Sequence, residues 1–178
     1  MSTCHRLVII TGQEGVGKTT IVRALLPFVQ SGAALDAEEV GQVNPWHFDD
    51  AFKTLLWDNV AAVVRNFWEA GYATVIAGSF INDYPDYLQF RSRLDDDVGV
   101  DVVQLCASKA VRDERRIARP KPTSEEWRDD VDRWCPEDTT LRTQATEYRH
   151  IRIENSSLSV AETVDQIRRA LPDVFLVG

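Results

Sequence analysis

The chain has 178 residues, 44% of them hydrophobic, and a formal net charge of −8 at pH 7. This length suits one domain with a sizeable core. The acidic balance argues against a surface that wraps nucleic acid, and no apolar stretch approaches the roughly 20 residues that a membrane-spanning helix needs.

Three cysteines, Cys4, Cys106 and Cys135, stand far apart and form no metal-binding pattern. They suit a reducing compartment and argue against a disulfide framework. The first residues also lack the long apolar region of a secretory signal. We therefore expect a cytoplasmic protein, a monomer or a homodimer, with no nucleic-acid or membrane partner.

The most specific motif lies near the amino terminus. Residues 12–19 have the sequence GQEGVGKT, which fills every fixed position of the phosphate-binding pattern G-x-x-x-x-G-K-[ST]. An apolar run at 7–11 precedes the motif and a helical pattern at 19–26 follows it, as the motif requires. The sequence therefore predicts a P-loop, in which backbone N–H groups, a helix N-terminus and Lys18 bind phosphate while the Thr19 hydroxyl binds Mg²⁺. The residues expected to contact the nucleotide here are Gly12, Gln13, Glu14, Gly15, Val16, Gly17, Lys18, Thr19 and Thr20.

The rest of the chain alternates between predicted strands and helices. After a stop at Pro27, the patterns predict further strands at 33–35, 73–77, 100–105 and 151–153. They predict helices at 48–70, 84–94, 109–118, 139–149 and from 159 to near 172. Residues 119–136, rich in proline and charge, form either a mobile flap or a surface excursion. Strands that alternate with helices predict a mostly parallel sheet covered on both faces.

Asp36 directly follows the short strand at 33–35, so we expect it at the carboxyl edge of the sheet, near the P-loop. A carboxylate there can accept the proton of a substrate hydroxyl, or bind Mg²⁺ through water. Alternatively, Asp36 only caps a helical turn together with Glu39. Glu38 is a second acidic candidate at the same edge.

Four arginines, Arg112, Arg115, Arg116 and Arg119, recur at a spacing that places them on one face of a helix. This face continues into residues 119–136. If that segment closes over a triphosphate, we expect Arg115 and Arg119 to stabilise the charge of the transferring phosphoryl group. The alternative is a solvated stripe that neighbouring acids balance.

Aromatic and polar residues near the predicted strand ends indicate an acceptor site. The residues expected to contact the acceptor are Asp36, Glu38, Trp46, His47, Ser79 and Tyr84. Neither the strand at 73–77 nor the strand at 100–105 ends in the carboxylate that P-loop hydrolases place there. This absence argues against a motor or a GTPase switch and favours a small kinase.

Four segments now support a family resemblance: the P-loop at 12–19, residues 35–39, residues 105–109 continuing to Arg115 and Arg119, and residues 150–155 followed by Ser159. In these segments the chain resembles the small P-loop kinases of the adenylate, shikimate and chloramphenicol phosphotransferase type, and most of all the tunicamycin-resistance ATP-binding protein group. It departs from nucleotide kinases and from shikimate-type kinases at residues 78–81, where neither of their motifs is present.

The resemblance implies a three-layer α/β P-loop NTPase fold, with a five-stranded parallel sheet in the order 2-3-1-4-5. It implies a single domain over residues 1–178, with a lid at about 119–136 after the fourth strand. It also implies that ATP and Mg²⁺ bind at the P-loop and that Arg115 and Arg119 are lid arginines. Asn155 is then part of the adenine wall, and Asp36 is a base or a substrate anchor.

We therefore expect a phosphotransferase that moves the γ-phosphoryl group of ATP-Mg²⁺ to a hydroxyl of a small molecule, either a metabolite or an antibiotic. Two alternatives stay open. One is a nucleoside or nucleoside-monophosphate kinase. The other is a non-catalytic protein that binds nucleotide and sequesters an antibiotic.

Overall fold

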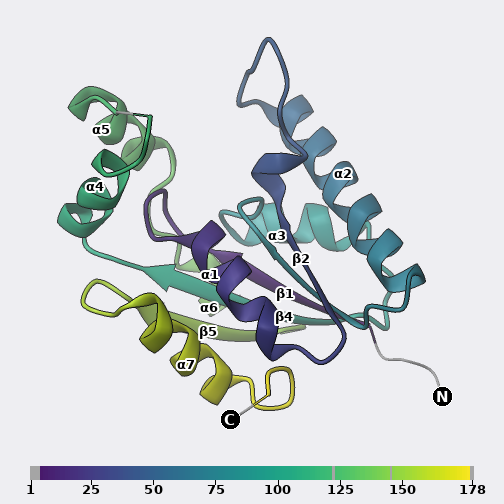
Figure 1. Cartoon of the computed structure of the whole chain (residues 1–178). Coiled ribbons are helices and arrows are strands. Elements are labelled where there is room, and N and C mark those ends of the chain that lie inside the picture. Colours follow the sequence, from purple (N-terminus) through teal and green to yellow (C-terminus); the bar gives the residue numbers. More distant parts are fainter. Residues whose placement is uncertain (1–4, 122, 145, 177–178) are drawn as a thin grey trace.

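The computed structural model describes residues 5–121, 123–144 and 146–176, so Cys4 and Pro122 lie outside the described residues. The described chain forms one five-stranded parallel sheet with helices on both faces (Figure 1). Its strand order is β2-β3-β1-β4-β5, which confirms the predicted order 2-3-1-4-5.

The strands are β1 (Arg6–Thr11), β2 (Gly32–Asp36), β3 (Thr74–Gly78), β4 (Gly99–Cys106) and β5 (Arg149–Glu154). The middle of β1 is fully buried from Leu7 to Ile10, because helices cover both faces of the sheet. The strand register places Asp36 beside Gly78, and Gly78 beside Ile10. The carboxyl ends of β1, β2 and β3 therefore meet at the edge from which the P-loop leaves β1.

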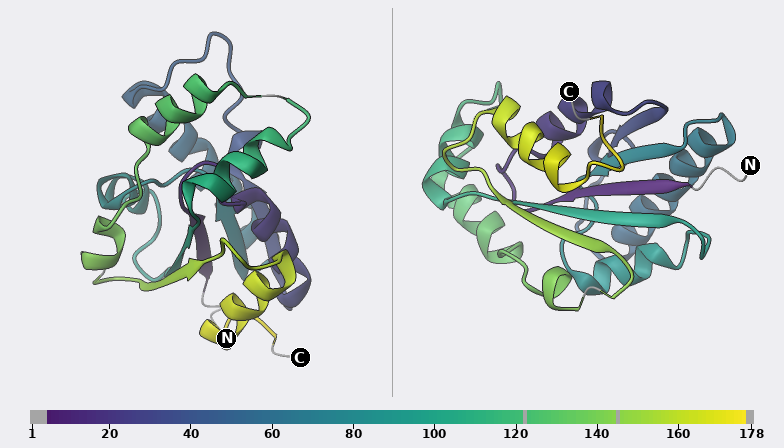
Figure 2. Two further views of the ribbon diagram at one scale, coloured as in Figure 1. Left: turned by 90° about the vertical axis from the view of Figure 1, so that its left-hand side faces the viewer. Right: turned by 90° about the horizontal axis from the view of Figure 1, so that it is seen from below.

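Helices α1 (Lys18–Leu25) and α7 (Val160–Ala170) cover one face of the sheet, whereas α2 (Asp50–Glu69), α3 (Tyr84–Arg91) and α6 (Thr140–Thr143) cover the other (Figure 2). Short 3₁₀ turns follow α1 and β2, at Leu26–Phe28 and Ala37–Glu39. Each face has its own apolar core. In the part of the chain that the structure describes, no helix is long and apolar enough to cross a membrane.

Helices α4 (Lys109–Ile117) and α5 (Glu125–Trp134) extend beyond the carboxyl end of β4, at the left of Figure 1. Helix α5 lies within residues 119–136, here called the lid segment, for which the sequence predicted no helix. Ser124 caps α5 by accepting a hydrogen bond from the backbone N–H of Trp127. The acidic residues Glu125 and Glu126 occupy its first turn, where their negative charge interacts favourably with the helix dipole.

The predicted helix at 139–149 is wrong over most of its length. Among the described residues of this range only the four of α6 are helical, and β5 already begins at Arg149. Parallel pairing with β4 takes Arg149 into the sheet, and the buried Tyr148 hydroxyl donates a hydrogen bond to the carbonyl of Leu141. These tertiary contacts override the local helical pattern. Helix α3 also ends at Arg91, before the predicted position 94.

An ion-pair network joins the strands at the opposite edge of the sheet from the P-loop. Asp101 of β4 is 2% exposed and pairs with Arg6 of β1 and Arg149 of β5, at 3.2 and 2.5 Å. Both arginines also pair with Asp173, which follows α7. The network therefore links β1, β4, β5 and the carboxyl-terminal turn.

The capping box at the start of α7, which the sequence predicts at Ser159 and Glu162, can be tested by mutation. Ser159 accepts from the backbone N–H of Glu162, whose carboxylate accepts from the backbone N–H of Ser159. Replacement of a capping serine by alanine costs about 1 kcal/mol. We expect Ser159→Ala to lower the free energy of unfolding in urea by that amount, whereas Thr54→Ala, at an exposed position inside α2, should change it by less than about 0.5 kcal/mol. Equal effects of the two variants would contradict the capping role.

Candidate active site

The P-loop lies directly against β4 and α4. A Cβ atom on Gly12 would lie 2.2 Å from the carbonyl oxygen of Leu105, and one on Gly15 would lie 2.8 Å from that of Arg112. Both glycines have positive φ angles, 132° and 89°, which disfavour other residues. The fixed and variable glycines of the motif therefore allow close backbone packing, and their role in phosphate binding stays a prediction.

Lys18 begins α1 and folds back over the P-loop. Its ammonium group donates to the carbonyl oxygens of Gly12 and Gln13, at 2.9 and 3.2 Å. Burial lowers the pKa of Lys18, and the nearby carboxylates of Glu14, Glu38 and Asp36 oppose this effect. Lys18 therefore lies at the meeting point of the P-loop and the acidic residues after β2.

Arg115 of α4 also reaches the P-loop. Its guanidinium donates to the carbonyl of Val16 and to both oxygens of Asn155, at 2.9–3.1 Å. Asn155, which is 3% exposed, donates in turn to the carbonyl of Val16. The Val16 side chain is buried in the core, so only its backbone faces this region. Asn155 therefore positions Arg115 beside the P-loop, and a direct contact with adenine stays a prediction.

The four arginines of the predicted stripe divide into two pairs with different partners. Arg115 and Arg119 reach the P-loop, where Arg119 pairs with the Glu14 carboxylate. Arg112 and Arg116 are 5% and 0% exposed, and both bind one oxygen of Asp132 in α5. The stripe is therefore not simply solvated. One pair contacts the P-loop, and the other holds α5 against α4.

Two further contacts tie the lid segment to the P-loop. Arg116 donates to the carbonyl of Glu14 at 2.6 Å, and Gln13 donates to the carbonyl of Cys135 at 3.2 Å. Burial alone raises the pKa of Asp132, but the bonds from Arg116 and Arg112 outweigh it and hold that pKa below its usual range. The carboxylate therefore stays ionised and keeps α5 on α4.

The two acidic residues after β2 have different surroundings. Asp36 is 5% exposed, and one of its oxygens accepts a hydrogen bond from the backbone N–H of Glu38. Its partner in this cap is therefore Glu38, and Glu39 instead pairs with Arg23. The Glu38 side chain is exposed overall. Partial burial of its carboxyl group nevertheless raises its pKa, and the nearby carboxylates of Asp36 and Glu14 raise it further.

The predicted acceptor residues are only partly brought together. Trp46 and His47 are exposed in the loop before α2, and the Trp46 ring lies 6.0 Å from the rings of Phe48 and Phe52. Tyr84 packs against Tyr87 in the core on the α2–α3 face. Ser79, directly after β3, has a φ angle of 70°. Its buried hydroxyl has no hydrogen-bond partner among the described residues.

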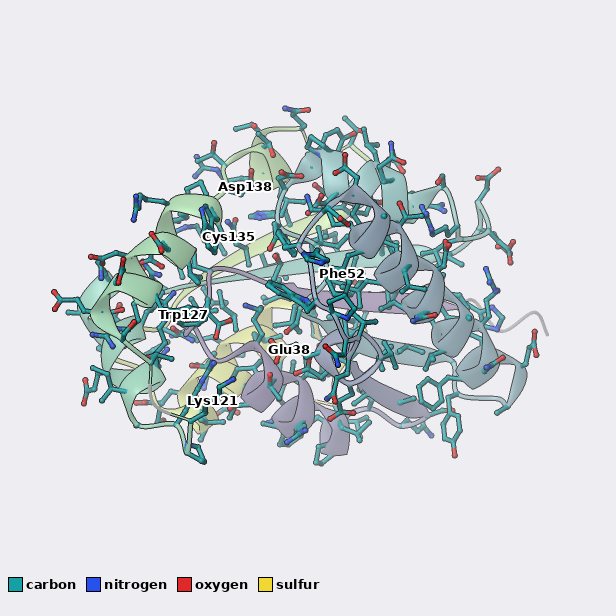
Figure 3. All side chains as sticks on the ribbon, turned by 90° about the horizontal axis from the view of Figure 1, so that it is seen from above. Glu38, Phe52, Lys121, Trp127, Cys135 and Asp138 are labelled. Atoms are coloured by element: carbon teal, nitrogen blue, oxygen red, sulfur yellow. The ribbon has the colours of Figure 1, made fainter. Side chains whose placement is uncertain are left out.

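A polar cluster that was not predicted from the sequence lies between α2 and α3. Lys53 pairs with Asp86 at 3.2 Å, and its ammonium group lies 5.4 Å from the centre of the Phe48 ring. Asp86, 5% exposed, also accepts from the backbone and the side chain of Asn82. No local sequence signal joins Lys53 to Asp86, which lies 33 residues further along the chain. In Figure 3, Glu38 and Phe52 lie on the side of β2 and α2, and Trp127 and Lys121 on the side of the lid segment.

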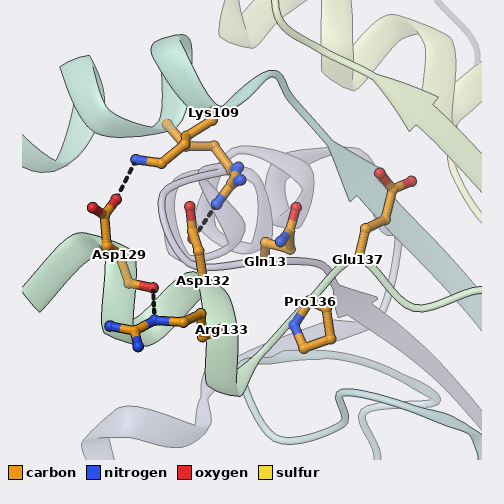
Figure 4. Close-up of a pocket in the computed structure, with 8 residues that line it drawn as sticks. Gln13, Lys109, Asp129, Asp132, Arg133, Pro136 and Glu137 are labelled. Carbon is orange, nitrogen blue, oxygen red and sulfur yellow. Dashed lines mark hydrogen bonds and ion pairs between the residues drawn. The ribbon is translucent and has the colours of Figure 1, made fainter.

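An open pocket of about 540 Å³ lies between α4, α5 and residues 136–137 (Figure 4). Of the predicted nucleotide-binding residues, only Gln13 lines it. Its other lining residues are charged or part of the lid segment, including Lys109, Asp129 and Arg133. This pocket therefore marks the base of the lid segment and not the phosphate site.

The donors around the P-loop suit a magnesium ion that phosphate and water largely coordinate. The Thr19 and Thr20 hydroxyls form no hydrogen bond with any residue that the structure describes, and one Asp36 oxygen is free of its cap. Within the described ranges no group of three or more His, Cys, Asp and Glu residues could hold a metal ion. Magnesium that binds with nucleotide needs only one or two protein oxygens, so these residues fit it.

Close packing at Gly15 can be separated from backbone strain. Gly71 has a similar φ angle of 94°, but a Cβ atom there would meet nothing within 4 Å. We expect Gly71→Ala to cost about 1–2 kcal/mol of unfolding free energy from strain alone. Gly15→Ala should cost about 1–3 kcal/mol more, because the methyl group would push α4 away. Equal losses in denaturant titrations would show that the contact with α4 is unimportant.

Comparisons with known proteins agree with this fold. No protein-family model and no curated protein sequence matches the chain. The tunicamycin resistance protein of Deinococcus radiodurans aligns with a TM-score of 0.63 and 20% identity, over 94% of this chain and 95% of that one. A gluconokinase from Sinorhizobium meliloti 1021 aligns at 0.68 and 13%, over 97% and 94%, and a shikimate kinase from Bacteroides thetaiotaomicron at 0.61 and 16%, over 93% and 98%. Over nearly its whole length, the chain has the fold of the small P-loop kinases.

Proposed function

We propose that the protein is an ATP-dependent phosphotransferase that acts on a hydroxyl group of a small molecule. The observation that carries this proposal is the convergence of Lys18, Arg115 and Arg119 on one P-loop, at the N-terminus of α1. Cations and backbone N–H groups that converge on a helix N-terminus suit the terminal phosphates of a nucleotide.

In this proposal the nucleotide lies between the P-loop and α4. Lys18 and Arg119 bind its terminal phosphates, and Arg115, which Asn155 holds in place, lies toward the base. Thr19 would hold Mg²⁺, which neutralises phosphate charge when it is bound. The lid segment excludes water from the reacting phosphoryl group.

The acceptor oxygen attacks the γ-phosphorus while the bond from that phosphorus to the bridging oxygen breaks, and ADP leaves with the electron pair. The acceptor proton goes to a carboxylate. We assign this role to Glu38, because its side chain is open to solvent and its raised pKa makes it a stronger base. Asp36, which is buried and bonded to the Glu38 backbone, is the anchor that orients the acceptor or the metal's water.

The charges between α2 and α3 favour a neutral or cationic acceptor. Burial raises the pKa of Asp83, and the nearby carboxylates of Asp86 and Asp138 raise it further. The cation that lies among them, Lys53, is already paired with Asp86. A nucleoside monophosphate would bring its phosphate to an acidic region in which the nearby described cation, Lys53, is already paired, and this argues against that alternative.

The aromatic group of exposed Trp46 and Phe48 and partly buried Phe52 suits an acceptor with a ring. The similarity to a tunicamycin resistance protein keeps antibiotics among the acceptors to be tested. It also keeps the sequestering protein as a second candidate, since strands β3 and β4 end without a carboxylate. That candidate predicts ATP binding with no ADP formed in the presence of any acceptor.

The phosphate role of Lys18 is tested by calorimetric titration with ATP-Mg²⁺. Loss of a charge-assisted hydrogen bond in Lys18→Ala should weaken binding about 10- to 100-fold. The matched control is Lys109→Ala on α4, whose ammonium group pairs with Asp113 and Asp129 and not with the P-loop. The control should bind ATP like the wild type. An unchanged affinity in Lys18→Ala would remove this lysine from the nucleotide site.

The two acidic residues are separated by kinetics. ADP formation is first measured with a panel of neutral, cationic and anionic ring-bearing alcohols to find an acceptor. With that acceptor, Glu38→Gln should lower kcat about 10²–10⁴-fold, as loss of a general base does. Asp36→Asn should act mainly on KM.

The pH dependence gives a second readout of the Glu38 assignment. A protonated carboxyl group cannot accept the acceptor's proton, so kcat/KM of the wild type should fall as pH decreases through the raised pKa of Glu38. This acidic limb should be missing from the residual activity of Glu38→Gln. Full turnover in Glu38→Gln, with a collapse in Asp36→Asn, would assign the base role to Asp36.

A further inference from the structure

Glu14 occupies a variable position of the phosphate-binding motif, between the two cations assigned to the terminal phosphates. Its carboxylate lies 2.5 Å from the Arg119 guanidinium and 3.9 Å from the Lys18 ammonium group. The same residue is fixed through its backbone, because Arg116 donates to its carbonyl at 2.6 Å. The Glu14 carboxylate therefore already pairs with the cations that the phosphates of a bound nucleotide would need.

The charged groups around Glu14 come from three elements. Lys18 belongs to α1, Arg116 and Arg119 belong to or directly follow α4, and Glu38 follows β2. Burial alone raises the pKa of Glu14, but the combined effect of Lys18, Arg119 and Arg116 lowers it below its usual value. The carboxylate is therefore ionised at neutral pH and shielded from solvent, with 21% of its side chain exposed.

We propose that Glu14 is an internal substitute for the terminal phosphates and thereby sets the affinity for nucleotide. This inference rests on the proposed function. Nucleotide binding is then an exchange, in which phosphate oxygens replace the Glu14 carboxylate on Arg119 and beside Lys18. The protein's own ion pairs are lost in the exchange, so the observed affinity is lower than the phosphate contacts alone would give.

The substitute also keeps Arg119 in place before nucleotide binds. The Arg119 side chain is 47% exposed and pairs only with Glu14 among the described residues, so without Glu14 it would sample many rotamers. Glu14 therefore has two opposing effects, because it orders the arginine and competes for it. We infer that the competition with phosphate is the larger effect. Phosphate can displace the Glu14 carboxylate only at the cost of its favourable interactions with Lys18, Arg116 and Arg119.

The test is the affinity for ATP-Mg²⁺ of Glu14→Gln, which keeps the shape of the side chain and removes its charge. A partly shielded ion pair contributes only modestly to binding or stability. We therefore expect the dissociation constant to fall about two- to fivefold, and this gain should shrink at high salt because it is electrostatic. The melting temperature without ligand should fall slightly, because Lys18 and Arg119 lose their counterion.

Two further variants complete the experiment. Glu114→Gln removes the same charge from an exposed side chain of α4 that forms no hydrogen bond or ion pair with any described residue, and should leave the affinity unchanged. In an Arg119→Gln background, Glu14→Gln should give a smaller gain, because the competition for Arg119 no longer exists. Glu14→Ala gives a second measurement of the same effect if the glutamine variant folds poorly.

An equal or weaker affinity for ATP-Mg²⁺ in folded Glu14→Gln or Glu14→Ala would overturn the inference, since it would show that Glu14 supports nucleotide binding. The outcome is distinct from failure of the proposed function. If the wild type itself gives no heat of association with ATP-Mg²⁺, the phosphotransferase proposal fails. If the wild type binds and the Glu14 variants bind no more tightly, only the role of Glu14 is wrong.

Discussion

The arrangement of the site depends on the direct packing of α4 against the phosphate loop. The absence of a side chain at Gly15 allows the Arg112 backbone to approach, and Arg116 then closes the contact by binding the carbonyl of Glu14. Because α4 is fixed in this way, Arg115 reaches the loop from its last turn, and Arg119 reaches it from just beyond the helix. The same helix carries the lid segment through Asp132. The contact between Gly15 and α4 thus positions both Arg115 and Arg119 and the helix α5 of the lid segment.

The frame of the fold could be predicted from the sequence because its signals are local. The P-loop pattern, the apolar runs of the central strands and the capping box at Ser159 each lie within a few residues, and each has the predicted structure. The strand order came from a family resemblance, and the structure confirms it. The lid helix α5 was not predicted, and the helix at 139–149 was predicted too long, because contacts with other elements, such as the pairing of β5 with β4, decide these segments.

The site itself was predictable only in part. The spacing of the four arginines gave their shared helix, but it could not tell that a carboxylate twenty residues beyond Arg112 would divide them into two pairs. In the same way, nothing in the local sequence joins Lys53 to Asp86. The result is a site with two different sides. Arginines gather near the proposed nucleotide, and carboxylates gather near the proposed acceptor, with Lys18 between them.

The network of Asp101, Arg6, Arg149 and Asp173 lies at the other edge of the sheet from all of these groups. It crosslinks three strands and the carboxyl-terminal turn, so part of the stability of the sheet comes from residues that lie away from the proposed reaction site. Substitutions in the loops above the P-loop would leave this network intact. Such a separation would let descendants of one scaffold acquire new substrates by exchanging loops alone.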